Sequence, residues 1–307
     1  MKKESMYTDS GTGEKTPWRL WLPEEGEPRA LVQLVHGMAE HIDRYDDTAN
    51  ALTKAGFAVV GHTHIGHGKN AMVPGWFSEQ NGWQHLLEDI HMIRGLAQER
   101  YPDIPYIILG HSMGSFLVRC YIALHAEGVT AAVLSGTGDF DNNVVSAGLA
   151  VAKVVCALGG AKKPSNLINK MAFGANNKAF EPARTPFDWL SRDTEQVDRY
   201  VMDPACGFTF TGAGYRDLFT GILRMNEPRT IADVPKKLPL LFISGDKDPV
   251  GGMGAGVRAV AERYKQAGVQ SVDVMLFADG RHELFNEINR TEVWEKLIGW
   301  LNGQLKD

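Results

Sequence analysis

The sequence has few cysteines. Cys120, Cys156 and Cys206 are the three among 307 residues, and their wide spacing does not fit a disulfide framework. Basic residues open the chain without an apolar segment behind them, so a secretory signal peptide is not expected. These features predict a protein of the reducing cytoplasm.

An excess of positive charge is also lacking. Lys and Arg number 32 against 37 Asp and Glu, a formal net charge of -5, which excludes nucleic acid as the main partner.

Long hydrophobic runs are lacking as well. The most apolar long window, Val144 to Gly160, contains Lys153 and falls short of the roughly 20 apolar residues that cross a bilayer. We expect no transmembrane segment and interpret this window as a packed helix.

What the sequence does contain is a regular alternation of strands and helices. A meander of three strands is expected first, over 5–8, 16–22 and 30–35. The expected helix and strand pairs that follow are 43–55 with 57–61, 84–100 with 106–109 and 113–126 with 131–135, then strand 240–244, helix 256–267, strand 271–277 and helix 291–301. This order predicts an α/β fold, with a mostly parallel central sheet and helices on both faces. Functional sites in such folds lie at the carboxyl ends of the strands.

The alternation stops between residues 136 and 234. We predict that this segment is a helical cap inserted into an α/β core formed by residues 1–135 and 235–307. Nine aromatic residues occur between Phe173 and Phe219. They either form the core of the cap or line an apolar pocket above the site.

A candidate nucleophile lies in the motif Gly110-His111-Ser112-Met113-Gly114, which joins an apolar strand to a helix. Small residues two before and two after Ser112 allow a turn sharp enough to hold its hydroxyl clear of the sheet. A hydroxyl held in this way is typical of a nucleophilic serine.

Candidate partners of Ser112 follow the last two strands. His282 lies on the loop after strand 271–277 and is the predicted base, since serine, acid and histidine follow one another in this order. Two carboxylates, Asp246 and Asp248, follow strand 240–244. We favour Asp248 because it lies beyond the strand end, whereas Asp246 is better placed to bind the backbone of the turn.

The oxyanion of an acyl-transfer reaction needs backbone N–H donors. We predict these to be the amides of Met113 and of Met38, which follows the strand at 31–35. The residues expected to shape the two supporting loops are His36, Gly37, Gly110, His111 and Gly114. Glu40 and His41 either brace the first of these loops or are solvated.

Together these residues resemble the α/β-hydrolases, and within them the monoacylglycerol lipase and lysophospholipase-like branch, which is sometimes grouped with the serine aminopeptidases. The segments that carry the resemblance are His36-Gly37-Met38-Ala39-Glu40-His41, Gly66-His67-Gly68, Gly110-His111-Ser112-Met113-Gly114, Gly245-Asp246-Lys247-Asp248 and Gly280-Arg281-His282. The family places its acid three residues after the strand-end glycine, which selects Asp248. The resemblance and the apolar cap imply hydrolysis of a small ester or lipid with an apolar acyl chain, without metal or cofactor.

One segment departs from the family pattern. Where the family carries D-x-R-G-H-G, this chain has Thr63-His64-Ile65-Gly66-His67-Gly68, so both charged residues are missing. Together with His62, this stretch also looks like the metal motif H-x-H-x-D-H with glycine in place of aspartate. A zinc hydrolase using His62, His64 and His67 is therefore an alternative.

Two further alternatives keep the same fold. An amidase or serine aminopeptidase would place acidic residues near the free amine of its substrate. Candidates in the cap, which could equally form a solvated face, are Asp188, Asp193, Glu195, Asp198 and Asp203. A non-catalytic ligand-binding protein is the other alternative, because fold does not fix function.

Overall fold

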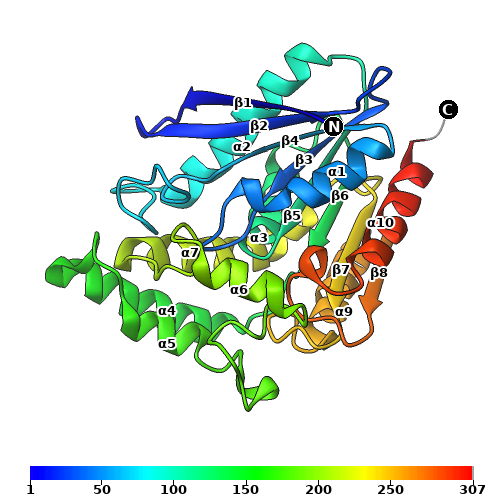
Figure 1. Ribbon diagram of the computed structural model, residues 1–307. Helices are drawn as coiled ribbons and strands as arrows, with labels where there is room; N and C mark the ends of the chain where they lie inside the picture. Colours follow the sequence, from blue (N-terminus) through cyan, green and yellow to red (C-terminus); the bar gives the residue numbers. More distant parts are fainter. Residues whose placement is uncertain (306–307) are drawn as a thin grey trace.

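The computed structural model describes residues 1–305 and contains one eight-stranded sheet (Figure 1). The strands are β1 (Lys2–Asp9), β2 (Lys15–Leu22), β3 (Ala30–Val35), β4 (Phe57–His62), β5 (Tyr106–His111), β6 (Val129–Ser135), β7 (Leu240–Gly245) and β8 (Val272–Phe277). Their order across the sheet is β1-β2-β4-β3-β5-β6-β7-β8. Strands β1 and β2 pair antiparallel, as do β2 and β4, and the remaining pairs are parallel.

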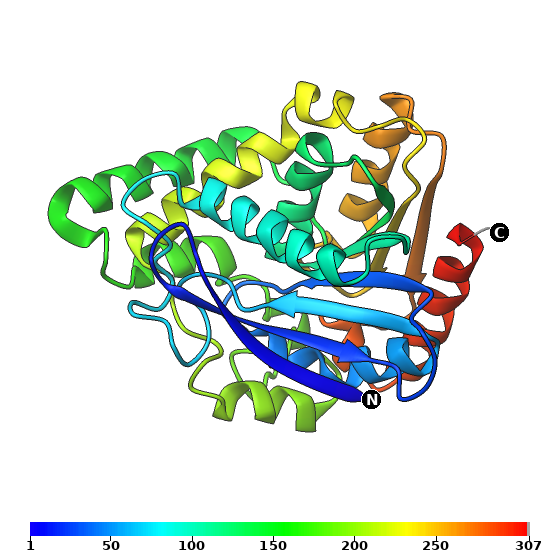
Figure 2. The same cartoon turned by 90° about the horizontal axis from the view of Figure 1, so that it is seen from above.

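Helices cover both faces of the sheet (Figure 2). The helices are α1 (Asp46–Lys54), α2 (Gly82–Arg100), α3 (Met113–Leu124), α4 (Asn142–Val155), α5 (Asn166–Phe173), α6 (Thr194–Met202), α7 (Gly212–Asn226), α8 (Pro228–Ala232), α9 (Ala255–Gln266) and α10 (Arg290–Gln304). Side chains of α2, α3 and α9 form the core on one face, and those of α1 and α10 form it on the other. Strands β3, β4, β5 and β7 are therefore buried throughout, which explains their nearly continuous apolar sequences.

The prediction of an α/β fold with a mostly parallel sheet is confirmed. The expected meander of three strands is wrong, because β2 pairs with β4, and β3 lies between β4 and β5 and runs parallel to both. The other differences lie at element ends. The first strand begins at Lys2 rather than at residue 5, and the expected helix 43–55 opens with a 3-10 turn, Ile42–Tyr45, before α1 begins.

The chain between β6 and β7 forms α4 to α8 and two short helical segments, Cys156–Gly160 and Lys178–Phe180, and its described residues contain no strand. The longest connection, over 174–193, joins α5 to α6. In Figure 1, α4, α5 and α6 lie beyond the sheet on the side toward which β6, β7 and β8 point. Helix α7 also packs against α2 and α3. The division into a core and a cap over 136–234 stays a prediction, and residues 306 and 307 of the predicted core lie outside the described residues.

The apolar window from Val144 to Gly160, which was expected to be a packed helix, is only partly packed in the structure. The window is helical and packs against α7, but Val144 and Leu158 are 71% and 82% exposed. Despite Lys153, the helix over Asn142–Gly160 is long and apolar enough to cross a membrane by length and composition, and 11% of the window is buried. One such helix is weak evidence for a membrane span.

Candidate active site

Ser112 lies between the end of β5 and the start of α3. Its backbone has φ 52° and ψ −121°, a strained conformation for a residue with a side chain. A Cβ on Gly110 would lie 2.3 Å from the carbonyl oxygen of Gly114, and one on Gly114 would lie 2.0 Å from the carbonyl oxygen of Val35. A side chain at either glycine would collide with the backbone, so both positions require glycine. The strained backbone at Ser112 produces the sharp bend between strand and helix.

His282 and Asp248 meet on adjacent loops at the ends of β8 and β7. The Nδ1 atom of His282 lies 3.0 Å from both carboxylate oxygens of Asp248, and both residues are buried. Asp246 instead accepts a hydrogen bond of 2.8 Å from the backbone N–H of Asp279. Of the two candidate acids, therefore, Asp248 contacts the histidine and Asp246 holds the loop.

The buried pair tunes the protonation of both partners. Burial by itself would raise the pKa of Asp248, but the adjacent His282 brings that pKa below its ordinary value. Burial would lower the pKa of His282, yet Asp248 raises it above the ordinary value. An Nδ1–H that donates to Asp248 leaves Nε2 of the neutral imidazole as the proton acceptor.

Ser112 and His282 line one cavity of about 840 Å³, together with Met38 and Met113. A Cβ on Gly37 would lie 3.1 Å from the Cβ of Ser112, so the loop after β3 closely approaches the serine. Within residues 1–305 no hydrogen bond joins Ser112 to His282. Such contacts often form only when substrate is bound.

Glu40 braces the loop after β3. Its Oε1 accepts hydrogen bonds from the backbone N–H of Gly37 at 2.6 Å and from the hydroxyl of Tyr45 at 2.9 Å. Gly37 N–H is engaged in this way and is not available to another acceptor, and the role predicted for the Met38 amide stays a prediction. His41 is not solvated either, since its Nε2 lies 2.9 Å from a carboxylate oxygen of Asp203.

Arg44, whose side chain is 11% exposed, links this loop to the loop of His282. Arg44 contacts Glu40 and also forms a two-pronged ion pair with Glu283 at 2.6 and 2.7 Å. Burial alone would raise the pKa of Glu283, but Arg44 lowers it to about 2. The sequence analysis did not find this link. The i, i+4 spacing of Glu40 and Arg44 could have suggested half of it, whereas Glu283 is 239 residues away from Arg44.

Four buried histidines lie behind the same loop. Hydrogen bonds connect three of them in one direction, from His62 Nε2 to His64 Nδ1, from His64 Nε2 to the carbonyl of His36, and from His36 Nδ1 to the carbonyl of Gly37. The carbonyl of His36 can only accept, so His64 Nε2 donates and the neutral His64 ring accepts at Nδ1. The backbone N–H of His64 donates to His36 Nε2, so His36 donates from Nδ1. Burial lowers the pKa of His62 to about 3 and that of His67 to about 4, so the cluster is uncharged at neutral pH.

These hydrogen bonds bear on the zinc alternative and on the missing family charges. Both ring nitrogens of His64 are engaged, and His67 Nδ1 contacts the carbonyl of Ile65 at 3.0 Å. His62 Nδ1 and His67 Nε2 have no hydrogen-bond partner, but within residues 1–305 these three histidines do not bring their nitrogens as close together as a metal site requires. Thr63 and Ile65 stand where the family has its Asp and Arg, and the neighbouring neutral imidazoles support the loop through His36 and Gly37.

His111 packs beside the candidate base. Its ring centre lies 4.8 Å from that of His282, and its Nδ1 lies 3.3 Å from the hydroxyl of Ser135. Burial, with a contribution from His282, lowers the pKa of His111 to about 3. The residue therefore fills the space behind the base without adding charge.

The cap aromatics take both of the roles considered for them. Phe210 and Tyr215 are fully buried in the core. Six others line the cavity above Ser112, namely Phe173, Phe187, Trp189, Tyr200, Phe208 and Phe219.

This sheet, with a serine at the elbow after β5 and a histidine and carboxylate on loops at the same end of the sheet, defines an α/β-hydrolase. The family model described as serine aminopeptidase, S33, matches residues 26–289, and the chain belongs to this family. It is an ester-hydrolysing enzyme.

Lipases and an esterase are similar to this chain over three quarters of its length or more. The monoacylglycerol lipase of Mycolicibacterium smegmatis is 31% identical over 297 residues, which is 95% of each protein. The monoglyceride lipase of Mus musculus is 31% identical over 75% of this chain and 68% of its own length. The crystal structure of a thermostable carboxyl esterase from Bacillus coagulans in complex with glycerol matches with a TM-score of 0.90, 32% identity and full coverage of both chains.

Proposed function

We propose that this protein is a serine hydrolase that cleaves carboxylic esters with an apolar acyl chain through an acyl-enzyme intermediate. The observation that supports this most strongly is the placement of Ser112 and His282 on one cavity, with Asp248 bonded to the far side of the imidazole.

The proposed reaction follows from this arrangement. Ser112 Oγ attacks the acyl carbon while His282 Nε2 accepts its proton. The amides of Met38 and Met113 bind the developing oxyanion, and His282 then donates the proton to the departing alcohol. A water molecule, deprotonated by His282, then attacks the acyl carbon, and His282 returns this proton to Ser112 Oγ as the acyl–oxygen bond breaks and the acid leaves.

The proposed substrate is a monoacylglycerol or a similar monoacyl ester. Aromatic cap side chains line much of the cavity, and its volume of about 840 Å³ lies within the usual range of small-molecule sites. Two relatives are named for monoacylglycerol or monoglyceride hydrolysis, and the esterase structure holds glycerol. An apolar chamber suits the acyl chain better than it suits a charged amine.

The aminopeptidase alternative finds little support in the cap carboxylates. None of the five candidates lines the cavity, and each is engaged by a neighbour: Asp188 by Thr185, Asp193 by Arg290, Glu195 by Arg199, Asp198 by Arg184 and Asp203 by His41. A free amine would therefore meet none of these five carboxylates in the cavity, and the further cap carboxylate that does line it, Asp139, pairs with Arg263.

Substrate comparison tests the proposal. Monoacylglycerols of graded chain length and an aminoacyl-nitroanilide are offered to the wild type and to Ser112→Ala. We expect the wild type to prefer the esters and Ser112→Ala to lose nearly all turnover. A preference for the anilide would favour the aminopeptidase, and equal, negligible rates from both proteins would favour a ligand-binding role.

A further inference from the structure

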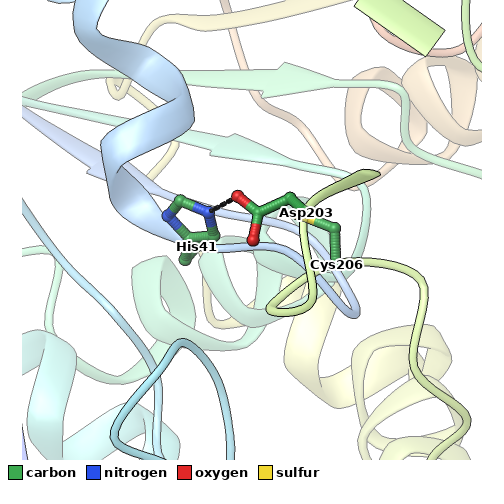
Figure 3. A group of neighbouring side chains, drawn as sticks. All are labelled: His41, Asp203 and Cys206. Carbon is green, nitrogen blue, oxygen red and sulfur yellow. Dashed lines mark hydrogen bonds and ion pairs between the residues drawn. The ribbon is translucent and has the colours of Figure 1, made fainter. Parts of the chain in front are cut away.

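A second cluster of reactive side chains lies outside the cavity, where the cap meets the loop after β3. His41, Asp203 and Cys206 place one nitrogen, one oxygen and one sulfur atom within 4.8 Å of one another (Figure 3). His41 Nε2 and Asp203 Oδ2 are already 2.9 Å apart. Cys206 is buried, whereas the side chain of Asp203 is 27% exposed, so the cluster opens to solvent on the Asp203 side.

Backbone contacts hold this cluster in place. The carbonyl of Ala39 accepts hydrogen bonds from the backbone N–H of Gly207 at 2.9 Å and from the hydroxyl of Tyr200 at 3.1 Å. On the cap side, the backbone N–H of Cys206 donates to the carbonyl of Asp203 at 2.9 Å. The two segments that carry the donor atoms are thus fixed against each other independently of the three side chains.

The donor set has a specific chemical preference. Imidazole, carboxylate and thiolate together are typical ligands of zinc and of related borderline-soft divalent ions. We propose that His41, Asp203 and Cys206 form a three-ligand site for a zinc-type divalent ion, with water as the fourth ligand. Such an ion would tie the cap directly to the loop that carries Met38.

Small movements suffice to form this site. Tetrahedral zinc with ordinary bond lengths separates its nitrogen and oxygen ligands by about 3.3 Å and its nitrogen and sulfur ligands by about 3.6 Å. His41 and Asp203 therefore need to separate by a few tenths of an ångström, and Cys206 needs to turn its sulfur inward. The ion releases the thiol proton to solvent, and the carboxylate and thiolate then balance its two positive charges.

The surrounding charges are compatible with a cation. Arg44 acts on Cys206 through its charge, and Glu40 and Glu283 already pair with this arginine. The positive charge of Lys69 also acts on Asp203 and helps to lower its pKa. The ion would therefore enter a region in which the positive charge of Arg44 is already balanced by two carboxylates.

Cadmium titration of the purified full chain, after chelator treatment, tests the site without using enzyme activity. We expect one equivalent of Cd²⁺ to produce an ultraviolet thiolate-to-metal band, to be displaced by Zn²⁺ and to raise the melting temperature. Cys206→Ser should abolish the band. The matched control Cys156→Ser removes a different cysteine and should leave the band unchanged.

Asp203→Asn and His41→Gln keep the thiol and test the other two ligands. Loss of a residue that only supports a metal ligand typically weakens metal binding by roughly 10- to 100-fold. Loss of a ligand itself should weaken Cd²⁺ binding by at least this much. Circular dichroism confirms that the variants are folded. The proposal is wrong if the wild type gives no band, if the band persists in Cys206→Ser, or if binding is unaffected in both ligand variants.

Discussion

Acidification should destabilise the protein through the histidines behind the loop after β3. Burial lowers the pKa of His62 to about 3 and that of His67 to about 4, whereas an unfolded chain has histidine pKa values near 6.5. Between these limits the unfolded state binds more protons than the folded state. Stability contributed by the two residues is therefore complete above about pH 6.5 and is lost as the pH falls toward their folded pKa values.

The size of the effect follows from the two pKa differences. At about pH 4.5 an unfolded histidine is almost fully protonated while His62 remains almost neutral, so each residue costs about 2–3 kcal/mol relative to neutral pH. A typical domain is stable by only about 5–15 kcal/mol. Asp89 acts in the opposite direction, because burial raises its pKa to about 7 and its protonation in the folded state favours folding in acid.

The assay compares variants so that other titrating groups cancel. Urea unfolding, followed by tryptophan fluorescence, gives the unfolding free energy at pH 7 and pH 4.5 for the wild type, His62→Asn and Val60→Ala. His62→Asn should lose about 2–3 kcal/mol less than the wild type on acidification. Val60→Ala, which truncates a buried side chain on the same strand, should be less stable at both pH values but retain the full pH dependence. If His62→Asn keeps the wild-type pH dependence, the fold does not hold His62 neutral.

Further predictions concern the candidate acids Asp248 and Asp246, the ion pair of Arg44, the candidate base His282 and the effect of a chelator. Asp248→Asn should lower kcat by on the order of 10⁴-fold with a nitrophenyl ester, because the imidazole loses its orienting carboxylate, and Asp246→Asn should cost far less; the reverse order would show that the wrong acid was chosen. Arg44→Met should reduce stability by about 3–5 kcal/mol in urea unfolding, since it leaves Glu283 buried without its cation; an unchanged midpoint would contradict this. Because Asp248 raises the pKa of His282, the acid limb of kcat/KM should lie above pH 6.5 in the wild type and move to lower pH in Asp248→Asn; a limb that does not move would refute the pairing. EDTA should leave ester hydrolysis intact. A loss of ester hydrolysis in EDTA would favour the alternative of a zinc hydrolase.

Much of the fold could be predicted because its local sequence patterns, the apolar strands and the placement of glycines, are each typical of the same fold. The buried runs of β3 and β5 and the glycines around Ser112 each point to one structure, since parallel strands need two covered faces and the elbow needs small residues. The preference for Asp248 over Asp246 followed from distance along the loop, and in the structure Asp248 is the acid bonded to His282.

Other features depend on contacts that a single sequence does not reveal. The link from Arg44 to Glu283 joins residues 239 positions apart, and local spacing carries no signal for it. Helix α4 is apolar, but its composition does not say which side chains find a partner, and Val144 is left largely exposed. The cytoplasmic location, the cap boundaries and the catalytic roles stay predictions.

Covalent capture of the serine tests the central claim most directly. The wild type and Ser112→Ala are each incubated with an alkyl fluorophosphonate, and their intact masses are measured before the labelled peptide is identified. We predict that the wild type gains a single phosphonyl group on Ser112, with parallel loss of ester hydrolysis, and that Ser112→Ala gains none. Equal labelling of both proteins, or a labelled wild type that still hydrolyses esters at full rate, would contradict the assignment of Ser112 as the nucleophile.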